Sequence, residues 1–456
     1  MDKHLNYYEV RWKNFKGFKD TQWIKIKPIT ILLGPNNSGK TSFLAPFLLM
    51  NQTLTSRDAY SPIISKGQVY DGGSIQELIN NYDLSKNISL AMRYHIHETD
   101  EELDEMGSDP PGAFEVTIGV NEEDGELIVK SESIYDTYYR EFFRLFLKKN
   151  KKYSMKGAVD LSKMRPEEIS AINSITPNSP INFLFSADSF LLNLFKQREE
   201  GKMKKRKGFS KEFTNLLDIL SFNYSRVRQY VGELSYIGPI RENPHRVYEV
   251  SNEIYNTVGS KGENMANLLK RHFTKRNKRM DLWIKKFGFG DWLELKKLYG
   301  NSYSIRFREN NSELYTSIAN AGFGASQLLP LIVQALCSPK GSLTIAEQPE
   351  IHLNPRLQCE LADLFAFMAK QDQRIIVETH SEHLLLRLRK LIANKTISSE
   401  DVAIYFVEKN AHSSIIRSIN VEKDGHIRPD QWPKDFFEDS LRESFSLARE
   451  QLKNKN

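Results

Sequence analysis

The pattern of hydrophobic and polar positions near the N-terminus predicts two strands that lead into a third, buried one. Residues 7–12 and 23–26 have the character of a hairpin-like pair of strands. Residues 29–33 are continuously apolar or β-branched, which is typical of a parallel strand that is covered on both faces. A glycine follows at position 34, and residues 41–54 have a helical pattern. This order predicts a buried strand, a tight turn and a helix.

The middle of the chain changes from a strand pattern to a helical one. The segment 86–132 alternates, and it predicts an antiparallel subsheet with an exposed acidic loop at 98–109. The strands of this subsheet are expected at residues 89–97, 114–120 and 126–130. The segment 133–235 is more polar, and we interpret it as an inserted α-helical lid. Its aromatic residues at helical spacing are Tyr138, Phe142, Phe143 and Phe146.

Strands and helices alternate in the last third of the chain, as a parallel sheet requires. Strands are expected at 234–238, 343–346, 375–378 and 403–407, and helices at 326–337, 355–370 and 381–393. The fold class is therefore α/β, with a mostly parallel sheet, an antiparallel subsheet and a helical lid. We expect residues 1–132 and 236–456 to be the two halves of one core, separated by the lid at 133–235.

The turn after the first buried strand matches the phosphate-loop pattern G-x-x-x-x-G-K-[ST] in full. Glycines allow backbone amides to face phosphate oxygens, and the helix N-terminus adds a partial positive charge. Lys40 would reach the β- and γ-phosphates of ATP, and the Thr41 hydroxyl would bind Mg²⁺. The expected nucleotide-binding residues of this loop are Gly34, Pro35, Asn36, Asn37, Ser38, Gly39, Lys40, Thr41 and Ser42.

Three later segments supply the polar residues that a phosphate loop needs for Mg²⁺ and for the attacking water. The strand at 343–346 is followed directly by acidic and amide residues, and the strand at 375–378 is followed by a histidine. Between residues 320 and 327 a glycine-rich turn leads into an apolar helix, with Ser326 in the expected N-cap position. The candidate catalytic residues are Lys40, Glu347, Gln348, Glu350 and His380.

The order of these motifs resembles that of ABC-type ATPases of the SMC kind. The residue sequence of the motifs is similar to that of one branch, the bacterial OLD-like and PtuA-like ATPases. Many of these belong to anti-phage defence systems. The matching segments outside the phosphate loop are residues 14–18, 236–241, 320–327, 347–350, 378–383, 425–427, 432–433 and 436–437. The resemblance covers most of the chain, but not the segment 133–235.

The resemblance implies roles for particular residues. Gly324, Ser326 and Gln327 would contact the γ-phosphate of an ATP held by a second copy of the chain. Glu347 would hold Mg²⁺ through water, and His380 would contact the γ-phosphate. Such signatures act between subunits, so the resemblance implies a head-to-tail dimer or larger assembly around ATP and Mg²⁺.

One position departs from the pattern of the family. ABC-type ATPases usually have a glutamate directly after the Mg²⁺ carboxylate, and this chain has Gln348 there. A neutral amide cannot act as a general base, and loss of that base typically costs about 10²–10⁴-fold in rate. Glu350 is a possible substitute. Slow hydrolysis, or an ATP-gated clamp, is therefore an open alternative to a full ATPase cycle.

Composition narrows the setting without identifying a partner. The net charge of +6 is modest for 456 residues, and the two cysteines have neither metal-ligand nor disulfide spacing. The N-terminus has no apolar signal segment, and no apolar run is long enough to cross a bilayer. We therefore expect a cytoplasmic protein with no membrane partner.

Several residues have both a structural and a functional interpretation. The basic runs 202–207 and 271–279 are either solvated loops or contacts for nucleic acid or an acidic protein. Arg241 is either a structural cation or a phosphate contact, and Gln52 is either a helix end or a nucleotide-sensing residue. Only 73 residues follow His383, without the clustered acids of a Toprim nuclease, so an effector nuclease would be a separate subunit.

Three functions fit these observations. The first is the ATP-binding subunit of an anti-phage defence complex, which responds to a phage-derived trigger and controls a separate nuclease. The second is a DNA-repair ATPase related to RecF and SMC proteins. The third is a nucleotide-dependent scaffold with little turnover, which Gln348 favours.

Overall fold

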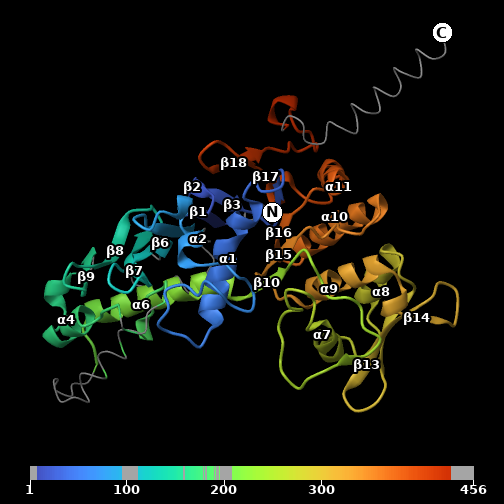
Figure 1. Cartoon of the computed structure of the whole chain (residues 1–456), viewed down its shortest axis with the longest axis horizontal. Coiled ribbons are helices and arrows are strands. Elements are labelled where there is room, and N and C mark those ends of the chain that lie inside the picture. The colour runs from blue at the N-terminus through green and yellow to red at the C-terminus, as the bar shows by residue number, and fades with distance from the viewer. Residues whose placement is uncertain are drawn as a thin grey trace, which may run out of the picture.

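The computed structural model of the chain describes residues 8–94, 111–157, 160–177, 179, 182–188, 191, 195 and 208–432. The acidic loop expected at 98–109, the basic run 202–207 and the segment 436–437 lie outside these residues. Three sheets organise the described part, with the eight-stranded antiparallel sheet on the left of Figure 1 and α7, α8 and β13 of the four-stranded sheet on the right. The described helices are all too short or too polar to span a membrane.

The phosphate-loop strand lies inside a six-stranded sheet whose order is β10-β15-β16-β4-β17-β18. Its first five strands run parallel, and β18 is antiparallel to β17. The strand bounds are β4 Ile29–Leu33, β10 Leu234–Ile237, β15 Leu343–Glu347, β16 Arg374–Glu378, β17 Val402–Lys409 and β18 Ser414–Ile419. The predicted parallel strands are confirmed to within two residues at each end.

Both faces of this sheet are buried, which explains its continuous apolar strands. In β4, Leu32 belongs to the core shared with α1, whereas Ile31 and Leu33 belong to the core shared with the later helices. The helices are α1 Lys40–Thr55, α2 Ile75–Leu78, α4 Pro166–Asn173, α6 Lys211–Val227, α7 Met265–His272, α8 Lys278–Lys286, α9 Phe323–Cys337, α10 Pro355–Lys370 and α11 Glu382–Ala393.

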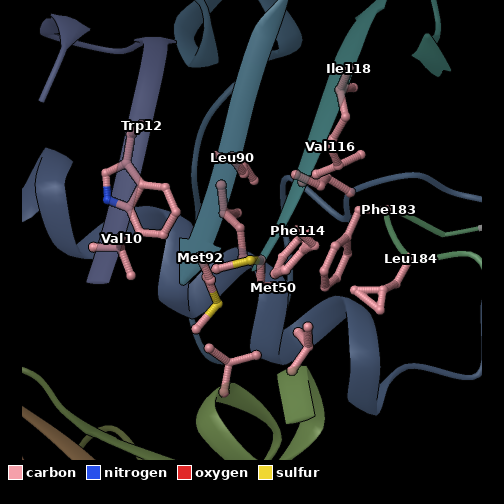
Figure 2. Packing of buried hydrophobic residues seen from close by; sticks show 14 of the residues in the cluster. Val10, Trp12, Met50, Leu90, Met92, Phe114, Val116, Ile118, Phe183 and Leu184 are labelled. Atoms are coloured by element: carbon pink, nitrogen blue, oxygen red, sulfur yellow. The ribbon is translucent and has the colours of Figure 1, made fainter. Parts of the chain in front are cut away.

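The antiparallel sheet is larger than the sequence predicts. It has eight strands in the order β2-β1-β5-β6-β7-β8-β9, with β3 paired to β1. The strand bounds are β1 Tyr8–Phe15, β2 Phe18–Asp20, β3 Ile24–Ile26, β5 Ile88–Arg93, β6 Pro111–Val120, β7 Leu127–Asp136, β8 Glu141–Leu147 and β9 Tyr153–Gly157. Its inner face packs on α1, where Met50 lies beside Leu90, Met92 and Phe114 (Figure 2).

The helical interpretation of residues 133–235 is wrong for its first part. Residues 133–136 complete β7, and β8 and β9 continue the antiparallel sheet to residue 157. The boundary at 132 therefore falls inside a strand. Phe143 and Phe146 lie on β8 and pair with β7, so aromatic spacing that also fits a helix was misleading here. Helices α4 and α6 follow, as the lid prediction requires.

A four-stranded antiparallel sheet between β10 and α9 was not predicted. Its order is β11-β13-β12, with β14 paired to β13, and α7 and α8 pack against the same core. The strands are β11 Tyr248–Glu249, β12 Trp292–Lys297, β13 Ser302–Arg308 and β14 Tyr315–Ser317. These strands are short and interrupted by polar residues, so the sequence pattern gives only a weak strand signal.

Candidate functional site

The phosphate loop joins β4 to α1 through a backbone that only small residues allow. Gly34 has φ +144, and a Cβ there would lie 2.1 Å from the carbonyl oxygen of Val407. Gly39 has φ +111, and its Cβ would lie 2.5 Å from the Ser414 hydroxyl. Strands β17 and β18 therefore press on the loop from one side, and any larger residue at either glycine would push it away.

Lys40 is held against the loop that it follows. Its Nζ donates hydrogen bonds to the carbonyl oxygens of Gly34 and Pro35, both at 2.9 Å. The same Nζ lies 3.8 Å from Oε1 of Glu378, and the Thr41 hydroxyl donates to Oε2 of Glu378 at 3.1 Å. Glu378 is the last residue of β16, the strand next to β4. One buried carboxylate thus contacts the two side chains that are expected to bind phosphate and Mg²⁺.

Parallel pairing of β15 with β16 brings Glu347 beside Glu378. The two glutamates are register partners at the carboxyl ends of these strands, and both are about 95 % buried. On the other side, the Tyr236 hydroxyl of β10 donates to Oε1 of Glu347 at 2.9 Å. Three neighbouring strands therefore place polar side chains at one edge of the sheet, next to the phosphate loop.

Burial shifts the pKa values of the ionisable groups at this edge of the sheet. Burial raises the pKa of Glu347 to about 7, and the nearby Glu378 carboxylate adds to this rise. Burial also raises the pKa of Glu378, although Lys40 opposes the shift. Burial lowers the pKa of Lys40, which the carboxylates oppose. A cation between the carboxylates and a phosphate on the lysine would relieve both sets of shifts.

Arg241 acts on the backbone after β15 rather than on the loop. Its guanidinium donates to the carbonyl oxygen of Glu347 at 3.0 Å and to that of Gln348 at 3.5 Å. Burial lowers the pKa of Arg241 to about 10, so it remains charged at neutral pH. The structural interpretation of Arg241 is therefore the one that its contacts support.

Gln348 occupies a turn that is fixed by its backbone. Its φ is +44, in the left-handed region that non-glycine residues rarely adopt. Its N–H donates to the carbonyl oxygen of Glu378 at 2.7 Å. The position next to Glu347 is thus tied to β16, and an amide side chain stands where a glutamate is usual for the family that the sequence resembles.

The Glu350 side chain is hydrogen-bonded to the backbone of His380. Its Oε1 accepts a hydrogen bond from the backbone N–H of His380 at 2.7 Å, and its side chain is buried. Burial lowers the pKa of His380, and the charge of Lys40 lowers it further, so the imidazole is neutral at pH 7. This arrangement gives Glu350 a positioning role for His380. That Glu350 also acts as the general base in place of residue 348 remains a proposal.

The signature segment is placed differently from the expectation in one respect. Helix α9 begins at Phe323 with Gly322 as its N-cap, so Ser326 lies in the first turn and is not the N-cap. The Ser326 hydroxyl donates to the Phe323 carbonyl oxygen at 2.8 Å, and Ser326 and Gln327 are buried. The outward part of the signature is Gly322, Phe323 and, partly, Gly324, with Phe323 48 % exposed.

The phosphate loop opens into a space of suitable character for a nucleotide. A cavity of about 570 Å³ is lined only by residues 36–42 and Glu378. A second cavity of about 740 Å³ shares Asn37, Gly39 and Ser42 with it and adds polar residues of the N-terminal and β17–β18 segments. Its further lining includes Lys16, Lys66, Tyr82, Lys409 and His412. The first cavity suits phosphates, and the second suits the remainder of a nucleotide.

Mg²⁺ fits the same edge of the sheet. Among the residues that the structure describes, no group of three or more His, Cys, Asp or Glu forms a metal site. Mg²⁺ at phosphate sites keeps waters and takes few protein ligands. The Thr41 hydroxyl with the carboxylates of Glu347 and Glu378 supplies the hard oxygen ligands that it prefers. When bound, Mg²⁺ would neutralise charge on the β- and γ-phosphates.

Glu378 and Tyr236 are the residues that sequence reasoning missed. Glu378 ends a predicted strand and belongs to a matched segment, so its place at a strand end was the available signal. No pattern in the amino-acid sequence connects Tyr236 to Glu347, because the pairing of β10 with β15 creates that contact. Gln52 bonds to Ile64 and Tyr70, which supports its structural interpretation.

Two protein-family models match this chain. The family model described as "AAA ATPase domain" matches residues 8–385, and a "Protein of unknown function (DUF3696)" model matches residues 397–447. No curated protein matches the chain.

Solved structures with similarity include an SMC head bound to the C-winged helix domain of ScpA, at 13 % identity and a TM-score of 0.42. The match covers 92 % of this chain and 98 % of that one. The SMC head domain from Thermotoga maritima has 13 % identity and a TM-score of 0.37, over 91 % and 100 % of the two chains. At these values the similarities add nothing to what the family match establishes.

Proposed function

The chain belongs to the AAA ATPase domain family, and we propose that two copies bind Mg-ATP between them, head to tail, and control a separate effector nuclease in anti-phage defence. The family makes the protein a P-loop ATPase. The observation that carries the finer proposal is the convergence of Lys40, Thr41, Glu378 and Glu347 at one edge of the parallel sheet. These groups suit a triphosphate with its metal ion.

The separation of the signature from the phosphate loop supports the dimer. Neither loop cavity is lined by a residue of the signature, whereas Gly324 lines another cavity with His352, Asn354 and Arg356. A signature that faces away from its own phosphate loop is available to the nucleotide of a second copy. The resemblance of the motif sequences to those of OLD-like and PtuA-like ATPases supports the defence role and the separate nuclease.

A scaffold with little turnover is the second candidate, and Gln348 favours it. Gln348, the residue next to Glu347, has no side chain that can act as a general base. The Glu350 carboxylate accepts a hydrogen bond from the His380 N–H. ATP would then lock the dimer without being consumed quickly.

Mg-ATP turnover by the purified chain tests these candidates, with Lys40→Ala as the blank and Gln348→Glu as the comparison. We expect Lys40→Ala to abolish nucleotide binding, because no other described side chain occupies its place in the loop. Slow wild-type turnover that rises about 10²-fold in Gln348→Glu would support the scaffold. Fast wild-type turnover that Gln348→Glu leaves unchanged would exclude it.

The effector is tested separately by co-expression with nucleases encoded beside the chain. A nuclease that co-purifies with the wild type, and whose activity changes with ATP, would support the defence proposal. DNA-stimulated ATP turnover without such a partner would favour the repair function instead.

A further inference from the structure

We propose that residues 270–279, together with Lys297, form a surface that binds the phosphate backbone of nucleic acid. We call residues 270–279 the basic crossing, because they connect α7 to α8 beside the four-stranded sheet, at the right of Figure 1. The proposal does not depend on the ATP site or on the effector.

Positive charge is concentrated in this part of the chain. Residues 265–308 contain twelve Lys and Arg against three Asp and Glu, a net charge of +9, while the whole chain has +6. The rest of the chain is therefore net acidic. Residues 270–279 contain six Lys and Arg and no acid. A local field of this kind attracts polyanions and is not a general property of the protein.

The basic crossing is fixed to the sheet at two points. Lys270 lies over the Tyr303 ring at 5.5 Å, and Arg276 lies over the Trp292 ring at 4.2 Å. The side chain of Asn277 caps α8 by accepting from the N–H groups of Arg279 and Met280. The segment is thus mounted on folded structure, which distinguishes it from a solvated loop that carries charge only for solubility.

Most cations of the basic crossing have no acidic partner. Arg276 pairs with Asp281 at 2.8 Å, but no ion pair within the described part of the chain involves Arg271, Lys275, Lys278 or Arg279. All four are exposed. Nearby cations of α8 are neutralised instead: Lys285 pairs with Asp291, and Lys286 with Glu360 and Asp363.

The position of two of these cations has an energetic cost. Lys278 and Arg279 are the first two residues of α8, where the helix dipole favours acids and disfavours cations. The acid in the first turn, Asp281, pairs with Arg276, and neither Lys278 nor Arg279 has an ion-pair partner among the residues that the structure describes. Local rules are most often broken in this way where a residue serves a binding function.

The tip of β12 extends the same surface. Lys297 is the register partner of Tyr303, whose ring carries Lys270, so the two lysines flank one aromatic residue. Lys297 is exposed on the same face of the sheet as Tyr303, and Tyr299, in the turn after β12, is 72 % exposed. Lys297 therefore adds a fifth cation without an ion pair among the described residues to Arg271, Lys275, Lys278 and Arg279, and Tyr299 offers a ring that can stack on a base.

Nucleic acid fits this surface better than an acidic protein does. The exposed residues of the basic crossing are all cationic or polar, namely Arg271, His272, Thr274, Lys275, Arg276, Lys278 and Arg279. Stable protein interfaces have an apolar centre that excludes water, which this segment lacks. Phosphate contacts need only accessible, unpaired Lys and Arg.

The test replaces Lys275, Lys278 and Arg279 by glutamine in the full chain and measures binding to a short fluorescein-labelled DNA duplex by anisotropy. We expect affinity to fall on the order of 10- to 100-fold. Each lost phosphate contact removes about 0.9 from the slope of log K against log salt, so the slope between about 50 and 200 mM KCl should flatten by nearly three.

The matched control replaces Lys151, Lys163 and Arg428 by glutamine, which removes the same charge from exposed cations that already have acidic partners. Equal affinity and equal salt slope in the two triple variants would overturn the proposal. So would competition by poly-L-glutamate that is as strong as competition by DNA, since it would indicate a protein partner. Thermal unfolding and fluorescent-ATP binding confirm that both variants are folded, and they report separately on the ATP site.

Discussion

At the scale of single residues, Glu378 is placed to have two opposing effects on nucleotide binding at the phosphate loop. Without nucleotide it is the nearest carboxylate to Lys40 and accepts from Thr41, so it competes with phosphate for both groups. If Mg-ATP binds there, the same negative charge would favour the metal ion. The residue should therefore weaken the binding of free ATP and strengthen the binding of Mg-ATP.

Glu378→Gln tests this balance. We expect fluorescent ATP to bind about three- to tenfold more tightly in EDTA, because a charge that repels the triphosphate is lost, and to gain less from added Mg²⁺. Glu400→Gln is the control, since Glu400 is exposed and its one ion pair among the described residues is with Lys27. The two-role account is wrong if both variants bind ATP like the wild type in EDTA and in Mg²⁺.

At the scale of elements, the antiparallel sheet contains a buried acid that its neighbours only partly compensate. Glu132 of β7 is fully buried, accepts from the Phe185 N–H at 2.7 Å and from the Asn223 amide of α6 at 3.3 Å. Burial raises the pKa of Glu132 to about 8, which the Phe185 contact opposes. The folded protein therefore keeps Glu132 protonated at a pH where the unfolded chain ionises it.

The sign of the pH dependence follows from that difference. The folded state holds a proton at Glu132 between the unfolded pKa of about 4.3 and the folded value of about 8, so stability is highest below this window and falls as the pH rises through it. Glu132→Gln should flatten the decline between pH 5.5 and 7.5 by up to about 1 kcal/mol per pH unit. Urea unfolding of both proteins at several pH values measures this, and parallel pH profiles would contradict it.

At the scale of the whole molecule, the outward face of the signature is where a second copy would meet the ATP of the first. Phe323 is 48 % exposed and its ring contacts His352 at a centroid distance of 4.9 Å. This face lies at the N-terminus of α9, and none of its residues lines the two cavities that the structure describes at the phosphate loop. An added negative charge there would oppose the γ-phosphate of the partner.

Phe323→Glu should therefore abolish ATP-dependent dimerisation in sedimentation experiments while leaving ATP binding by the monomer within about threefold of the wild type. Leu386→Glu is the control, because Leu386 is 46 % exposed on α11, a different helix from the one that carries the signature. Dimerisation of Phe323→Glu at the wild-type ATP concentration would exclude this face as the contact.

The sequence by itself determined the local features of this protein. The phosphate loop, its flanking strand and helix, and the later parallel strands depend on glycine geometry and on apolar runs, which neighbouring residues specify. The tertiary structure decided which distant residues meet. The register of β15 with β16 places Glu347 beside Glu378, the pairing of β10 with β15 brings Tyr236 to Glu347, and ladder pairing turns 133–157 into strands. Such contacts arise because strands far apart in the chain share hydrogen bonds, and no local pattern records them.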